Sequence, residues 1–167
     1  FDHADIFDNL AAIERQFHHL VRTVPASGRV VVNTDEESLK RVLEQGCWSD
    51  LAQFGMRANA QTNGWSVRGE PDNFAVIRHG QEVGRVQWNI TGVHNQLNAL
   101  AAIAAAEHVG VSPAQAAEAL SEFQNVRRRM EVRGSVHRTG GDITVYDDFA
   151  HHPTAIRTTV DGLRRKV

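Results

Sequence analysis

The chain has 167 residues, enough for one ordinary domain or for one domain with part of another. Its 18 basic and 20 acidic side chains give a formal net charge of −2, which argues against a dedicated nucleic-acid-binding protein, whose basic residues are in clustered excess. Hydrophobic residues make up 41% of the chain, which excludes wholesale disorder.

The first part of the chain predicts an α/β layer in which helices and strands alternate. Apolar residues recur at helical spacing from Asp8 to Val24, where Asp8 or Asp5 can cap the start of the helix. The β-branched run Arg29–Asn33 is typical of a buried strand, and Glu36–Glu44 predicts a second helix.

After the single cysteine, Cys47, the pattern changes to short strands broken by Gly, Asn and Pro. These segments lie near Leu51–Gly55, Gly64–Arg68, Phe74–Arg78 and Glu82–Ile90. The sequence His79-Gly80-Gln81 predicts a hairpin between the last two. We therefore expect an antiparallel extension of the sheet. A lone cysteine excludes an intrachain disulfide framework and a cysteine-rich zinc site, and it suits a reducing cytosol.

Two alanine-rich helices follow. Val93–Val109 gives the strongest helical pattern in the chain. The next helix has Ser112 as its N-cap, Pro113 at its first position and Gln115 to complete a capping box. Its expected buried residues are Ala116, Leu120 and Phe123. The longest apolar run, Ala99–Ala106, is far shorter than the ~20 residues that a membrane helix needs, so we expect no membrane partner.

The last part of the chain predicts the opening of a second domain. The segments Glu131–His137 and Ile143–Asp147 are strand-like, and Pro153 begins a final helix. A strand, a polar loop and a helix make the start of a βαβ unit whose other strands are missing. We place the domain boundary near residue 127. Because the chain also lacks a start methionine and a leader, we expect a piece of a longer cytoplasmic protein.

Four polar clusters could carry chemistry. The first is Asp2-His3-Ala4-Asp5, just before the first helix. Histidine and aspartate supply nitrogen and oxygen ligands for a divalent metal. The alternative is that Asp5 caps the helix and His3 is an exposed terminal residue.

The second cluster opens the alanine-rich helix. Asn95 and Asn98 are three residues apart and share one helix face. An amide carries a donor and an acceptor, which match the N6/N7 edge of adenine. The alternative is that His94 or Asn95 only caps the helix.

The third and fourth clusters flank the predicted boundary. In Arg127–Arg129 one guanidinium could bind a phosphate or a ribose, or the run could be a solvated charged segment. The segment Asp147–Thr154 lies at the carboxyl end of a strand beside a helix start, where α/β sheets bind ligands. A carboxylate there can accept from ribose hydroxyls and a histidine can donate to phosphate. The alternative is a capping aspartate and surface histidines.

Together these motifs resemble the Mur ligase superfamily of ATP-dependent amide ligases. The resemblance is carried by DHADIFD, GVHNQLNALAA, RRMEVRG and DDFAHHPTAI, in that order. It implies an α/β fold in which residues 1–127 form the later part of a central ATPase domain, with a mixed sheet and helices. Residues 128–167 would begin a Rossmann-like C-terminal domain.

The resemblance also implies roles for six residues. His3 matches the family's metal-binding histidine. The positions that match the family's nucleotide contacts are Asn95, Asn98, Arg129, Asp148 and His151. The implied cofactors are ATP and Mg²⁺. The family's phosphate-binding GTxGKT/S loop does not occur in these residues, so we expect the chain alone to be inactive and to hold part of a split site.

FDHADIFDNL and DDFAHHPTAI are most similar to the branch of the superfamily that acts in peptidoglycan recycling. It joins UDP-N-acetylmuramate to the tripeptide L-alanyl-γ-D-glutamyl-meso-diaminopimelate through an acyl phosphate. The alternatives are a ligase that adds L-alanine to UDP-N-acetylmuramate, and a non-catalytic binding domain. A third is a small metallohydrolase that uses His3, Asp5, His151 and His152.

Overall fold

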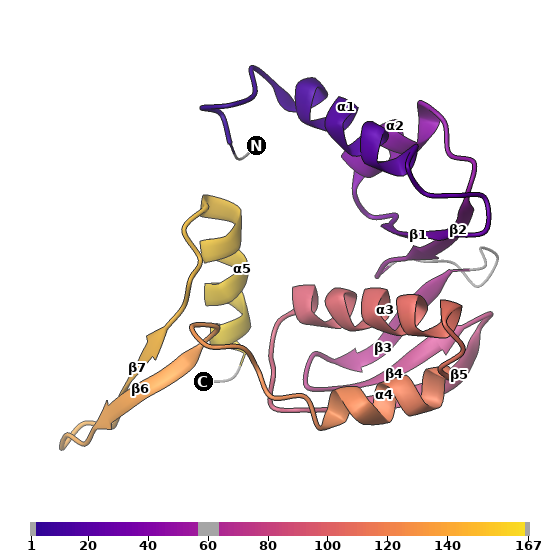
Figure 1. Ribbon diagram of the computed structural model, residues 1–167. Coiled ribbons are helices and arrows are strands. Elements are labelled where there is room, and N and C mark those ends of the chain that lie inside the picture. Colours follow the sequence, from indigo (N-terminus) through magenta and orange to yellow (C-terminus); the bar gives the residue numbers. More distant parts are fainter. Residues whose placement is uncertain (1–2, 57–63, 166–167) are drawn as a thin grey trace.

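A computed structural model describes residues 3–56 and 64–165 of the protein. Asp2, part of the first polar cluster, lies outside the described residues. The described chain forms a five-stranded sheet with helices packed on it, followed by a two-stranded hairpin and a final helix (Figure 1). None of the described helices combines the length and the hydropathy needed to cross a bilayer.

The first helices and strands confirm the predicted α/β layer. Helix α1 (Leu10–Val21) precedes β1 (Arg29–Asn33), and α2 (Glu37–Glu44) precedes β2 (Asp50–Phe54). Helices α1 and α2 pack on each other beside the β1 end of the sheet (Figure 1).

The predicted cap of α1 was wrong by one residue. Asn9, in an extended conformation, is the N-cap, and its side chain accepts a hydrogen bond from the Ala12 amide at 2.9 Å. A cap must lie two or three residues before the amide that it satisfies. Asp8 and Asp5 lie too early in the chain to do so.

The sheet has the order β1-β2-β3-β4-β5, with β3 at Trp65–Glu70, β4 at Asn73–Arg78 and β5 at Gln81–Gln87. Strands β3, β4 and β5 are antiparallel, as expected, with β4 and β5 joined by the predicted hairpin. The expectation was wrong for β2, which is parallel to both β1 and β3. Helix α2 crosses over between β1 and β2, and such a crossover returns the chain in the same direction.

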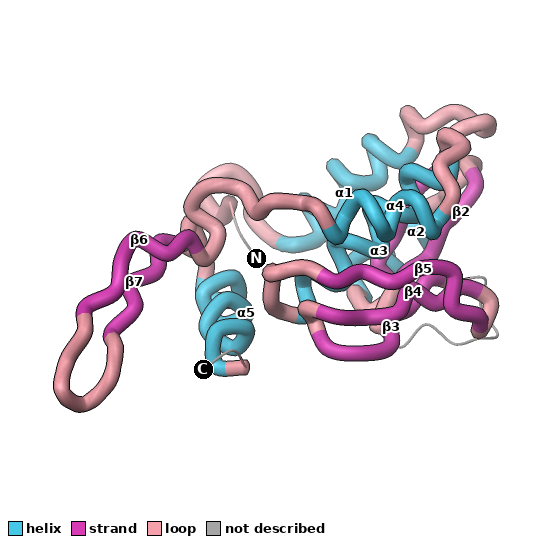
Figure 2. The backbone as a smooth tube through the Cα atoms, turned by 90° about the horizontal axis from the view of Figure 1, so that it is seen from below, coloured by secondary structure: helices cyan, strands magenta, loops and turns pink. Residues whose placement is uncertain are grey.

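Helices α3 (Val93–His108) and α4 (Pro113–Ser121) cover one face of the sheet (Figures 1 and 2). The predicted capping box of α4 is present, with Ser112 and Gln115 bonded reciprocally. Small residues bring α4 onto β5: a Cβ added at Gly84 would lie 2.9 Å from the Ala117 Cβ. The most buried members of the resulting core are Trp65, Phe74, Val76, Val86, Leu100, Ile103, Ala104 and Ala117.

Polar contacts fix α3 to the sheet near both ends of the helix. Near the start, the buried Gln96 donates from Nε2 to the Gly69 carbonyl at 3.2 Å. Near the end, Glu107 accepts from Arg29 at 3.1 Å and pairs with Arg78, whose guanidinium lies 4.7 Å from the centre of the Trp65 ring. The position of α3 on the sheet is therefore set by directional bonds as well as by apolar packing.

The second part of the chain consists of β6 (Glu131–Val136), β7 (Ile143–Asp147) and α5 (Pro153–Arg164). The β6–β7 hairpin projects away from the five-stranded sheet (Figure 2). Helix α5 contacts the first part at the loop before α3, where the Thr91 hydroxyl donates to the Gly162 carbonyl at 3.1 Å. Apolar side chains exposed on the hairpin and on α5 are Val132, Val136, Ile143, Val145, Ile156 and Val160.

We predict that Gln96→Ala destabilises the protein. The side chain is only 1% exposed, so its removal leaves a cavity and takes away the partner of the Gly69 carbonyl. The expected loss in the free energy of unfolding is about 2–4 kcal/mol. Denaturant unfolding measures this loss. The matched control, Gln16→Ala on the exposed face of α1, should change stability by less than about 0.5 kcal/mol. Equal effects of the two substitutions would contradict the role of Gln96.

Candidate functional site

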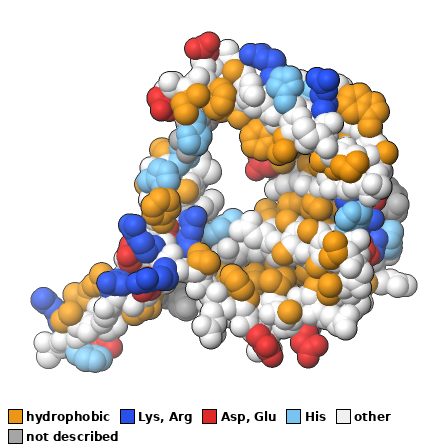
Figure 3. All heavy atoms as spheres, in the orientation of Figure 1, with side chains coloured by type: hydrophobic (Ala, Val, Ile, Leu, Met, Phe, Trp, Pro, Cys, Tyr) orange, Lys and Arg blue, Asp and Glu red, His pale blue; other side chains and the backbone are white. Residues whose placement is uncertain are grey.

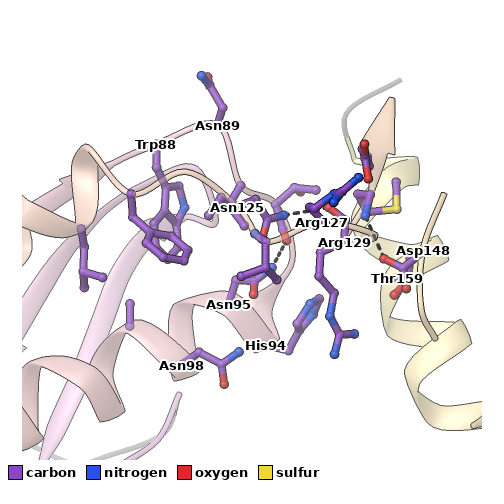
Figure 4. A pocket seen from close by; sticks show the side chains of 18 of the residues that line it. Trp88, Asn89, His94, Asn95, Asn98, Asn125, Arg127, Arg129, Asp148 and Thr159 are labelled. Atoms are coloured by element: carbon purple, nitrogen blue, oxygen red, sulfur yellow. Dashed lines mark hydrogen bonds between the residues drawn. The ribbon is translucent and has the colours of Figure 1, made fainter. Parts of the chain in front are cut away.

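A cleft of about 880 Å³ lies between the first half of α3, the segment that follows α4, and the end of β7. Of the residues singled out in the sequence, it brings together Asn95, Asn98, Arg129 and Asp148 (Figure 4). These side chains come from both parts of the chain, so the cleft spans the predicted boundary.

Helix α3 lines one side of the cleft, and its N-cap is Gly92, which makes no side-chain capping bond. Neither His94 nor Asn95 is the cap. Instead, Asn95 donates from Nδ2 to the Thr91 carbonyl at 2.7 Å, and its Oδ1 acceptor is not used by that bond. Asn98 lies one turn further along the same wall (Figure 4).

His94 lies beside these amides, folded over Gly92. A Cβ at Gly92 would be 2.6 Å from Cε1 of His94, and Gly92 has φ of +98°, so this position requires glycine. Burial lowers the pKa of His94, and the nearby Arg129 lowers it further, while Asp148 acts in the opposite direction. The imidazole is therefore neutral at pH 7, and it offers the cleft one donor and one acceptor.

The connection between the two parts, Arg128–Met130, has an unusual backbone. Arg128 and Met130 both have positive φ, at +58° and +52°. Residues other than glycine adopt this conformation only where the surroundings hold it. The Arg128 amide donates to Glu131 Oε2 at 3.0 Å, and the Arg128 carbonyl accepts from the Phe149 amide at 2.8 Å. Cationic side chains gather at the base of the hairpin (Figure 3).

Asp148 joins the end of β7 to this connection. Its Oδ2 accepts from the Met130 amide at 2.9 Å, and its Oδ1 accepts from the Ala150 amide at 2.8 Å. Both amides lie in loops, and α5 is capped by His152, so the alternative interpretation of a capping aspartate was wrong. The carboxylate also lines the cleft, where its remaining lone pairs can accept further hydrogen bonds.

An apolar wall of the cleft was missed in the sequence. Trp88 directly follows β5, is 8% exposed, donates from Nε1 to the Pro71 carbonyl at 2.7 Å, and packs edge-on against Phe74. Phe123 was expected in the core but lies beyond the end of α4, lines the cleft and is 46% exposed. The other apolar residues on this wall are Ile90, Leu120 and Val126.

The other histidines of the sequence motifs, His3, His151 and His152, lie outside the cleft lining. His151 is exposed, with Nδ1 3.0 Å from the Phe149 carbonyl and its ring packed edge-on against the Phe149 ring. His152 caps α5 through the Thr154 amide. His3 lies in the turn before α1, where its carbonyl accepts from the amides of Ile6 and Phe7. Among residues 3–56 and 64–165, no three His, Cys, Asp or Glu side chains converge on a metal position.

We predict that the contact between Glu131 and the Arg128 amide depends on pH. The hydrogen bond from the Arg128 amide lowers the pKa of Glu131 below the ordinary value of 4.5, and Arg133 lowers it further. A lowered pKa in the folded protein means that the contact is complete above pH 4.5 and is lost as the pH falls through the lower folded value. The Arg128 amide proton shift, followed by NMR, should therefore titrate with a midpoint below 4.5.

Glu131→Gln should remove this titration, and Glu118→Gln on α4 should leave it in place. A midpoint at or above 4.5 in the unsubstituted chain would contradict the contact.

Comparison with known proteins gives two family matches and many relatives. Residues 1–106 match the Mur ligase middle domain, and residues 128–167 match the Mur ligase, glutamate ligase domain. The UDP-N-acetylmuramate–L-alanyl-γ-D-glutamyl-meso-2,6-diaminoheptandioate ligase of Haemophilus influenzae is 51% identical over 100% of this chain and 36% of its own length. The Escherichia coli protein of the same name is 49% identical, over 100% of this chain and 35% of its own.

Further relatives are less similar. The UDP-N-acetylmuramate–L-alanine ligase of Salinibacter ruber is 34% identical over 96% of this chain and 33% of its own length. The crystal structure of a murein peptide ligase from Psychrobacter arcticus is 41% identical, with a TM-score of 0.72, over 96% of this chain and 33% of that one. The chain thus spans about a third of the length of these relatives. With two Mur ligase domains matched in order along it, the chain belongs to the Mur ligase family.

Proposed function

We propose that this chain supplies the nucleotide-binding residues of an ATP-dependent ligase that joins UDP-N-acetylmuramate to L-alanyl-γ-D-glutamyl-meso-diaminopimelate. The product is an amide, formed through an acyl phosphate, and the setting is peptidoglycan recycling in the cytoplasm. The names of the two relatives at 51% and 49% identity support these substrates.

The observation that carries the proposal is the cleft itself. Two amides on one face of α3 oppose a guanidinium and a carboxylate from the hairpin side, beside an apolar wall. An adenine offers a flat apolar face and a donor–acceptor edge, which suit Trp88 and the amides of Asn95 and Asn98. Asp148 then accepts from ribose hydroxyls, and Arg129 binds ribose or phosphate oxygens.

We place the boundary between the two contributing domains at residues 127 and 128. Residues 1–127 would be part of the central ATP-binding domain, and residues 128–167 the start of the C-terminal domain. This division lies at the start of the Arg128–Met130 connection, in which Arg128 and Met130 have positive φ.

His151 and His3 are proposed to act with parts of the enzyme beyond the described cleft. His151 lies two residues beyond Phe149 in the loop that Asp148 begins, and we assign it to the phosphates. His3 is proposed as a single ligand of Mg²⁺. The described residues do not by themselves form a metal site, because no three ligand side chains converge. The other Mg²⁺ ligands would be phosphate oxygens, waters and side chains from the rest of the enzyme.

The ligase that adds L-alanine is the second candidate, with the same chemistry and a smaller amine. The L-alanine ligase of Salinibacter ruber is 34% identical to this chain, whereas the tripeptide ligases of Haemophilus influenzae and Escherichia coli are 51% and 49% identical. This difference favours the tripeptide.

We predict that the 167-residue chain binds ATP weakly, with a dissociation constant on the order of 1 mM or higher. Three or four hydrogen bonds, each with a net contribution of ~0.5–1.5 kcal/mol, barely offset the ~4 kcal/mol or more that immobilising the ligand costs. NMR titration with ATP and Mg²⁺ measures the affinity. Shift changes should be concentrated at the start of α3.

Asn98→Ala should weaken ATP binding about 2- to 10-fold, since one bidentate contact is lost. Asn73→Ala, on β4 and outside the cleft lining, should leave binding unchanged. Micromolar binding, or equal effects of the two substitutions, would mean that the nucleotide lies elsewhere.

We predict that a full-length ligase in which this chain replaces the matching part of the Haemophilus influenzae relative forms an amide from UDP-N-acetylmuramate, ATP and the tripeptide. Mass spectrometry of the product measures the reaction, and the unaltered relative is the control for folding and assay. Product with L-alanine and not with the tripeptide would favour the second candidate. A folded chimera that is active with neither amine would contradict both.

A further inference from the structure

The two peptide groups on either side of Arg129 are both held by hydrogen bonds. The group between Arg128 and Arg129 is held through its carbonyl by the Phe149 amide, at 2.8 Å. The group between Arg129 and Met130 is held at both ends: its carbonyl accepts from Asn125 Nδ2 at 2.8 Å and its amide donates to Asp148 at 2.9 Å. Because a peptide group is planar, these bonds fix the rotation of both planes and hence the direction in which the Cα–Cβ bond of Arg129 leaves the backbone.

These anchors come from opposite sides of the cleft. Asp148 and Phe149 directly follow β7, the second strand of the hairpin, whereas Asn125 lies in the segment just beyond α4. Of the three, Asn125 is therefore the one that ties Arg129 to the part of the chain that carries α3. Figure 4 shows Asn125 bonded to the connection and the Arg129 side chain running down beside His94.

Packing in the core does not explain why an amide side chain stands at position 125. The Asn125 side chain is exposed and lines the cleft rather than the core. Its Oδ1 accepts from the neighbouring Val126 amide at 3.0 Å, and its Nδ2 reaches across to Arg129. The side chain thus contributes hydrogen bonds and little packing.

We infer that Asn125 is a positioning residue, which holds the Arg129 carbonyl and thereby directs the Arg129 guanidinium toward α3 and the nucleotide. The nucleotide part of this inference rests on the proposed function. The direction of the Arg129 side chain does not depend on the proposed function, and the pKa of His94 reports that direction in the absence of any ligand. The positive charge of Arg129 lowers the pKa of the His94 imidazole, and Asp148, on the hairpin side, raises it.

The first arm of the test measures the pKa of His94 by NMR on the chain without nucleotide. Asn125→Ala should raise this pKa, because the released guanidinium moves away from the imidazole. Arg129→Ala should raise it too, and in the Arg129→Ala background Asn125→Ala should add nothing. The matched control is Gln124→Ala, one residue earlier and outside the cleft lining, which should leave the titration unchanged.

The second arm measures ATP affinity for the same variants. Asn125→Ala should weaken binding about 2- to 10-fold, which corresponds to one hydrogen bond, and this loss should disappear in the Arg129→Ala background. A role limited to the stability of the loop would persist in that background and would leave His94 unchanged.

The outcomes separate the two claims. If the pKa of His94 does not respond to Asn125→Ala, or responds equally with and without Arg129, the positioning role is overturned. If the pKa of His94 changes as expected but Arg129→Ala leaves ATP affinity unchanged, the positioning role is supported and the proposed contact between Arg129 and the nucleotide is wrong.

Discussion

The close packing of α3 on the sheet is the constraint on which the rest of the structure depends. Buried residues on one face of α3, such as Leu100 and Ile103, form the centre of the core, and Gln96 fixes the helix lengthwise through the Gly69 carbonyl. Asn95 and Asn98 lie on the cleft side of the same helix. The cleft amides therefore take their positions from the core, and a helix with a free rotation about its axis could not present both to one ligand.

The hydrogen bonds that hold the Arg128–Met130 connection contribute about as much free energy as its backbone strain costs. Two residues with positive φ cost ~1–3 kcal/mol each. The hydrogen bonds that the connection makes with Glu131, Phe149, Asn125 and Asp148 contribute a net ~0.5–1.5 kcal/mol each. Neither set dominates, so the geometry persists only while most of the bonds are made. Polar side chains that look unremarkable in the sequence therefore matter at this point of the fold.

Local patterns predicted local structure well and long-range contacts poorly. The strand at Arg29–Asn33, the α3 helix and the Ser112 capping box each depend on residues that are close to one another in the sequence. The parallel direction of β2 depends on where α2 packs, which no pattern within β2 records. Phe123 has the spacing of a core residue, yet the helix ends before it and leaves it in the cleft.

Asp148 shows why a structural and a functional interpretation of one residue need not exclude each other. A carboxylate has about four lone-pair positions, and two backbone amides occupy two of them. The others remain for the ribose hydroxyls of the proposed nucleotide. Asparagine at this position would have one acceptor oxygen and no charge, so it could hold one of the two amides well and would offer a ligand a weaker acceptor. Because the Met130 amide belongs to the peptide group that Asn125 also holds, the carboxylate that would meet the ribose is the same one that helps to direct Arg129. On the proposed function, contacts to the sugar and to the phosphates therefore depend on one shared support.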